Sequence, residues 1–147
     1  MSNEDILMRN LHLLDVSQAM CQQETRLGLE PSTLSNPKVV WFALYHSLKH
    51  MLPQEDFVKS FEGWYPPRTV SDQLEFKKVC VSQIQKLEVQ GKIPRNFMIN
   101  KAVLDQPERI IEFLRYLTEF ALRSVYLNNF TEVLVQVSLK QQPNSEK

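Results

Sequence analysis

Two histidines one helical turn apart are the residues with the clearest chemical potential. His46 and His50, in HSLKH, would face the same side of a helix and could approach one metal ion. A zinc site needs about three or four protein ligands, and no further ligand is marked by its spacing. Lys49 and His50 have a simpler role as cations that complement the dipole of a helix ending before Pro53. We therefore predict no metal site.

The two cysteines offer little support for nucleophilic catalysis. Cys21 and Cys80 lack CxxC or other ligand spacing, and Cys80 lies on an apolar stripe typical of an inert core residue. The chain also has no GxxxxGK[ST], GxGxxG, GxSxG or HExxH motif. We predict a non-enzymatic protein without cofactors. The alternative is a small enzyme with a Cys–His or His–metal site.

The charges balance overall but are unevenly placed. Lys plus Arg and Asp plus Glu both number 17, which gives no reason to expect attraction to nucleic acid or an acidic membrane. No secretory or membrane-spanning run is present, and we predict a reduced intracellular protein. The segment of residues 77–101 is basic, and Glu88 is its only acidic residue. Its cations are Lys77, Lys78, Lys86, Lys92, Arg95 and Lys101. Composition alone favours an ordinary solvated face, and a contact for an anionic partner is the alternative.

The elements that would position these residues are helical. With 147 residues, 43% hydrophobic content, 3 glycines and 8 prolines, the chain fits one all-α domain with corners marked by proline. We expect four main helices and several short ones. Residues 2–25 would form a first helix closed by Gly28, and others would span 37–52, 54–61, 107–127 and 131–140. A head domain over 1–140 would precede a polar, disordered tail at 141–147.

The basic segment begins on a helix expected to start after Ser71 as its N-cap. Its apolar stripe consists of Phe76, Val79, Cys80, Ile84 and Leu87. Lys78 would then point to solvent, and Lys77 and Lys86 would lie at the margins.

An aromatic and proline-rich corner precedes this helix. Pro66 and Pro67 prevent helix continuation, and Trp64 is expected to cover the joint between two helices. Tyr65 would lie alongside Trp64 or remain exposed. Exposed stacking on nucleic acid is disfavoured, because RNA-binding modules usually combine such aromatics with a sheet.

In this order the motifs resemble a known family. They are LGLEP at 27–31, VVWFALYHSLKHML at 39–52, GWYPP at 63–67, LEFKK at 74–78, KIPR at 92–95 and ERIIEFLRYLTEFAL at 108–122. Together they resemble the N-terminal, calponin-homology-like domain of the sixth subunit of the augmin (HAUS) complex.

The resemblance implies a non-catalytic interaction head. Its partners would be other augmin subunits, especially the seventh, and the microtubule, with indirect recruitment of the γ-tubulin ring complex for branching nucleation. It would act in the cytoplasm, on the cytoskeleton, at the mitotic spindle and centrosome region. The alternatives are another microtubule-binding calponin-homology head, such as a kinetochore subunit, and a domain that binds only other subunits.

Overall fold

Side-chain caps define where most of the helices begin. The computed structural model describes residues 2–95 and 101–145, and their side chains except those of 101, 102 and 128–145. The hydroxyl of Ser2 accepts a hydrogen bond from the Asp5 amide at 3.1 Å and starts α1 (Asn3–Leu13). Asn36 caps α3 (Pro37–Met51) through the Lys38 amide at 2.9 Å, as predicted from Asn36 followed by Pro37.

The predicted boundaries of the first helix and of the helix expected after Ser71 were wrong. The first helix is broken into α1 and α2 (Gln18–Thr25), because Asp15 adopts a left-handed φ of 63° and Ser17 caps a new helix. Arg26, with φ 64°, terminates α2 in place of Gly28. The helix α5 (Val70–Val89) is capped by Thr69 in place of Ser71, and the Thr69 hydroxyl accepts a hydrogen bond from the Asp72 amide at 3.0 Å.

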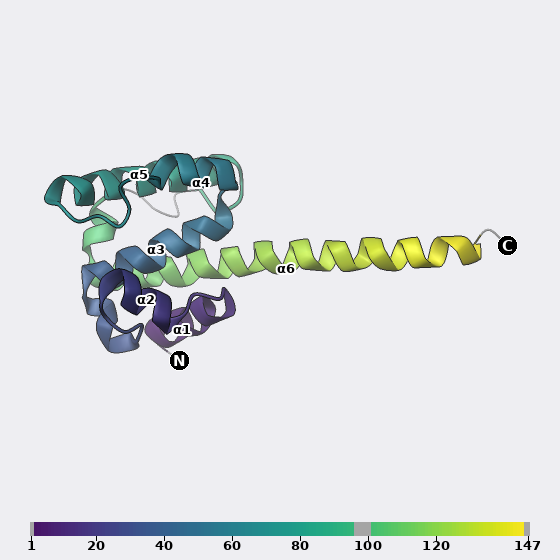
Figure 1. Cartoon of the computed structure of the whole chain (residues 1–147), viewed down its shortest axis with the longest axis horizontal. Coiled ribbons are helices and arrows are strands. Elements are labelled where there is room, and N and C mark those ends of the chain that lie inside the picture. The colour runs from purple at the N-terminus through teal and green to yellow at the C-terminus, as the bar shows by residue number, and fades with distance from the viewer. Residues whose placement is uncertain (1, 96–100, 146–147) are drawn as a thin grey trace.

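The remaining elements are α4 (Gln54–Phe61), the 3-10 turns η1 (Pro31–Ser35) and η2 (Lys101–Asp105), and α6 (Pro107–Ser145). Figure 1 shows α4 and α5 on one side of the head, α1 and α2 on the other, and α3 and α6 between them. Four long helices and several short elements agree with the predicted all-α class, and the described residues contain no strand.

α6 is longer than predicted. Residues 131–140, expected to form a separate short helix because of alternating valines, belong to α6, which projects beyond the head in Figure 1. No glycine or proline interrupts the sequence between 108 and 142, and extending a helix avoids the cost of a new nucleus. α6 crosses residue 140, and the division there into head and tail stays a prediction.

The core is centred on α3, which packs against α6, α2, α5 and α4, and α1 packs against α6. The predicted stripe of α5 is confirmed, because Phe76, Cys80, Ile84 and Leu87 are fully buried and Val79 packs against the core. Other fully buried side chains of the core are Leu7, Leu11, Phe42, Leu44, Leu48, Leu114 and Leu117. Burial of these apolar surfaces, rather than helix propensity, supplies most of the stability of such a domain.

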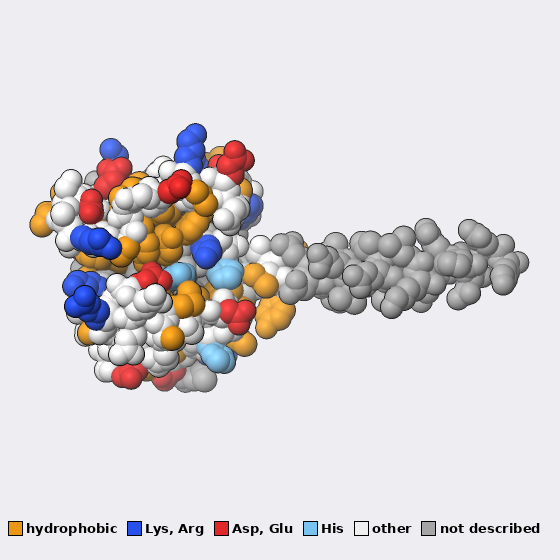
Figure 2. Space-filling model, in the orientation of Figure 1, with side chains coloured by type: hydrophobic (Ala, Val, Ile, Leu, Met, Phe, Trp, Pro, Cys, Tyr) orange, Lys and Arg blue, Asp and Glu red, His pale blue; other side chains and the backbone are white. Residues whose placement is uncertain are grey.

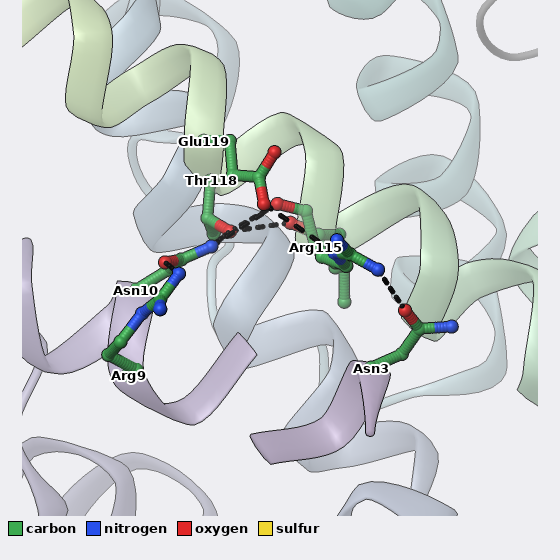
Figure 3. Close-up of polar contacts among 7 residues, drawn as sticks. Asn3, Arg9, Asn10, Arg115, Thr118 and Glu119 are labelled. Atoms are coloured by element: carbon green, nitrogen blue, oxygen red, sulfur yellow. Dashed lines mark hydrogen bonds and ion pairs between the residues drawn. The ribbon is translucent and has the colours of Figure 1, made fainter. Parts of the chain in front are cut away.

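A buried polar contact fixes α1 against α6 (Figure 3). Asn10 is fully buried, and its Nδ2 donates to Thr118 Oγ1 at 3.0 Å. Arg115 lies one turn away on α6 and donates to Asn3 Oδ1 at 2.8 Å. Buried polar groups require such partners, so these bonds specify how α1 is placed along α6.

Candidate functional site

The corner between α4 and α5 is packed rather than extended. Trp64 lies against the core, with ring centroids 5.7 Å from Phe61 and 6.2 Å from Phe76, and its indole N–H donates to the Ser60 carbonyl at 3.1 Å. Pro66 and Pro67 are half-buried beside it, before Thr69 starts the next helix. The structure thus places the aromatic and proline residues of GWYPP at the joint between the two helices.

Tyr65 connects this corner to α2 and α3. Its ring is stacked on Tyr45 with centroids 3.5 Å apart and planes 2° from parallel. Its hydroxyl donates to Glu24 Oε1 at 3.0 Å, while Glu24 Oε2 lies 2.9 Å from His46 Nε2. No local spacing in the sequence predicts this network, because Glu24, His46 and Tyr65 are far apart in the chain.

The burial of Tyr65 and its contact with Glu24 make the stability of the fold sensitive to alkaline pH. Burial, followed by the charge and hydrogen bond of Glu24, raises the pKa of Tyr65 well above its ordinary value of 10.0. Above that pH the unfolded tyrosine ionises and the folded one stays protonated. The stabilisation of the folded state by protonated Tyr65 is complete below about pH 10. At higher pH it falls by about 1.4 kcal/mol per pH unit.

Tyr65→Phe is therefore expected to lose less stability than the unmodified chain when the pH rises from about 9 to 11. At neutral pH it should cost about 1 kcal/mol through the lost hydrogen bond. Urea denaturation across this pH range measures both effects. A residual decline is expected, because burial also raises the pKa of Tyr45 and of the Cys80 thiol. Identical alkaline profiles would contradict the assignment.

A cleft of about 680 Å³ opens beside Tyr65, between α2, the start of α3 and the proline corner. Trp41, Tyr65 and the two prolines contribute its apolar lining. Three exposed cations, Arg26, Lys38 and Arg68, also line it. In Figure 2, Lys and Arg side chains lie at the left edge of this face of the head and also along its upper edge. Arg26, Lys38 and Arg68 were not predicted as site residues, because each is isolated in the sequence.

Lys77 lies apart from the other predicted basic residues. Its Nζ is 2.6 Å from Asp105 Oδ1 and 6.0 Å from the centroid of the Trp41 ring. Only 20% of its side chain is exposed, consistent with the predicted margin position. Lys77 and Lys86 are nine residues apart, about two and a half helical turns, and therefore point to opposite sides of α5. Lys77 thus connects α5 to η2.

The other basic residues are exposed but do not form one compact cluster. Lys78 and Lys86 share the outer side of α5, and Lys92 follows Gly91, whose φ of 74° ends the helix. Arg95 lines a hollow against α6 together with Arg109. The side chain of Lys101, the last member of the predicted set, lies outside the described residues.

Neither histidines nor cysteines assemble a reactive centre in the part of the chain that the structure describes. His46 contacts Glu24, and no group of three His, Cys, Asp or Glu side chains in these residues could hold a metal ion. Cys21 and Cys80 are buried, and burial raises the pKa of both thiols, which disfavours the reactive thiolate.

The described residues define an all-α head from which one long helix extends. No helix among them is long and apolar enough to cross a membrane. The sequence family described as HAUS augmin-like complex subunit 6 N-terminus matches residues 7–147. The chain belongs to this family, as its motifs predicted, and the family's name implies assembly with other augmin subunits.

Comparisons with curated proteins and with solved structures gave no match. The calponin-homology-like topology stays a prediction. Membership of the augmin family favours the augmin interpretation over a kinetochore head.

Proposed function

We propose that this chain is a non-catalytic interaction head that helps the augmin complex dock on spindle microtubules. The observation that carries the proposal is the pair of exposed lysines, Lys78 and Lys86, on the outer side of α5 in a member of the augmin family. Lys92 and Arg95 extend this positive charge beyond the helix. Exposed cations of this kind attract an acidic surface such as that of the microtubule.

In this proposal the chain helps to position the augmin complex and catalyses no reaction. Docking of the complex would bring the γ-tubulin ring complex to an existing microtubule indirectly, through other augmin subunits. The seventh subunit is the proposed direct neighbour. The corresponding location is the cytoplasm and cytoskeleton, at the mitotic spindle and the centrosome region.

Charge reversal on α5 tests the microtubule contact. Lys78→Glu combined with Lys86→Glu is expected to weaken microtubule co-sedimentation at low salt about tenfold, because two attractions become repulsions. The matched control is Lys49→Glu with Arg123→Glu, which changes the charge equally at two exposed positions on other helices. Equal losses of co-sedimentation in both variants would show that only the net charge matters. Unchanged co-sedimentation of the α5 variant would refute the contact.

An exposed apolar pair favours a second candidate, a domain that binds only other subunits. Val70 and Leu74 are 73% and 61% exposed and lie one turn apart on α5. Interfaces between subunits are anchored by apolar side chains more than by peripheral lysines. Loss of co-purification with the seventh subunit in Leu74→Ser, together with unchanged co-sedimentation in the α5 lysine variant, would favour this candidate.

A further inference from the structure

The cleft beside Tyr65 continues into a second, more apolar pocket. This pocket has a volume of about 290 Å³, and both hollows share Trp41 and Gln73 in their linings. We call the two together the Trp41 groove. It runs from α2 and the proline corner, past the first turns of α3 and α5, to η2 and the start of α6.

Positive charge dominates the cleft end of the Trp41 groove. Arg26, Lys38 and Arg68 are exposed, and none has an acidic side chain within ion-pair distance among the residues that the structure describes. The acid in this lining, Glu24, is already engaged by His46 and Tyr65. Three cations and one acid, Glu24, therefore line the cleft, and none of the three cations is ion-paired to Glu24.

The backbone conformation at the end of α2 determines where Arg26 lies. Arg26 has φ 64°, a left-handed conformation that residues other than glycine adopt uncommonly. Gly28, two residues later, does not carry the positive φ. The turn that ends α2 therefore holds an arginine at the mouth of the cleft.

The other end of the groove is suited to an apolar side chain. Seven of its lining residues are apolar, namely Leu34, Pro37, Val40, Trp41, Leu104, Pro107 and Ile110. Its charged residues, Lys77 and Asp105, neutralise each other at 2.6 Å. An apolar side chain entering this end would bury surface without leaving a charge unpaired.

We propose that the Trp41 groove binds an acidic linear peptide segment of another protein, with one large apolar side chain as its anchor. Carboxylates of the peptide pair with Arg26, Lys38 and Arg68, and the anchor enters the pocket between Leu34 and Ile110. Charge complementarity identifies the occupant, and the apolar pocket adds selectivity over a uniformly acidic chain. This inference goes beyond the microtubule proposal and uses none of the lysines on the outer side of α5.

The test is fluorescence anisotropy with the 147-residue chain and a labelled peptide that carries glutamates on both sides of one phenylalanine. The variant Arg26→Gln, Lys38→Gln, Arg68→Gln is expected to bind about tenfold more weakly, and added salt should weaken binding by the unmodified chain. All three side chains are exposed, so the variant should keep its thermal unfolding midpoint.

Two controls separate this groove from other surfaces. Lys49→Gln, Lys78→Gln, Lys86→Gln removes the same charge elsewhere and is expected to keep the affinity of the unmodified chain. Peptides with glutamine for glutamate, or serine for phenylalanine, should bind more weakly. Equal binding by the two triple variants, no preference among the peptides, or no binding of the acidic peptide at low salt would overturn the proposal. None of these results depends on microtubule binding.

Discussion

Phe76→Ala is expected to lower the free energy of unfolding by about 3–5 kcal/mol. Phe76 is fully buried on α5, in a cluster of rings. Its centroid lies 6.1 Å from Trp41, 5.9 Å from Phe61, 6.2 Å from Trp64 and 5.9 Å from Tyr65. Removing the ring leaves a cavity that rigid aromatic neighbours fill poorly.

Leu74→Ala is the matched control for this prediction. Leu74 lies two residues earlier on α5 but is 61% exposed, and its truncation should change the unfolding free energy by less than about 0.5 kcal/mol. Urea denaturation followed by circular dichroism measures both variants. Similar losses in the two would show that Phe76 does not join the corner to the core as described.

Leu117→Ala should destabilise the head by about 2–5 kcal/mol. Leu117 is fully buried in the part of α6 that packs against α1 and α3. The same helix carries Thr118, which is also fully buried and accepts the hydrogen bond from Asn10. A cavity at Leu117 therefore weakens the attachment of α1 as well as the central packing.

Tyr126→Ala tests where the contribution of α6 to the head ends. Tyr126 lies two and a half turns beyond Leu117 and is 57% exposed, and its truncation should cost less than about 0.5 kcal/mol. Thermal and urea unfolding of the two variants provide the comparison. A large loss in Tyr126→Ala would place it inside the cooperative unit, contrary to its exposure.

Local patterns were informative where a single residue type decides the backbone. Asn36 before Pro37 predicted the start of α3, and the stripe around Phe76 and Ile84 predicted the buried face of α5. Sequence patterns gave wrong helix boundaries where several backbone conformations fit the same local sequence. Asp15 in a left-handed conformation split the first helix, a choice that sequence periodicity does not reveal because Leu14 and Cys21 fit the same helical spacing.

The basic segment shows a second limit. Lys77 and Lys78 are adjacent in sequence, yet Lys77 pairs with Asp105 from η2 and Lys78 faces solvent. Counting cations along the chain cannot distinguish these roles, because an ion pair depends on a partner 28 residues away. The same reason explains why Arg26, Lys38 and Arg68 were missed.

By itself, the sequence determined the all-α class, most helix starts, the buried stripe of α5 and the family, because capping, proline placement, helical periodicity and ordered motifs are local properties. Only the tertiary structure decided that Tyr65 stacks on Tyr45 and bonds Glu24, and that three isolated cations line one cleft. These features arise when helices pack, because packing brings together side chains that no spacing along the chain relates.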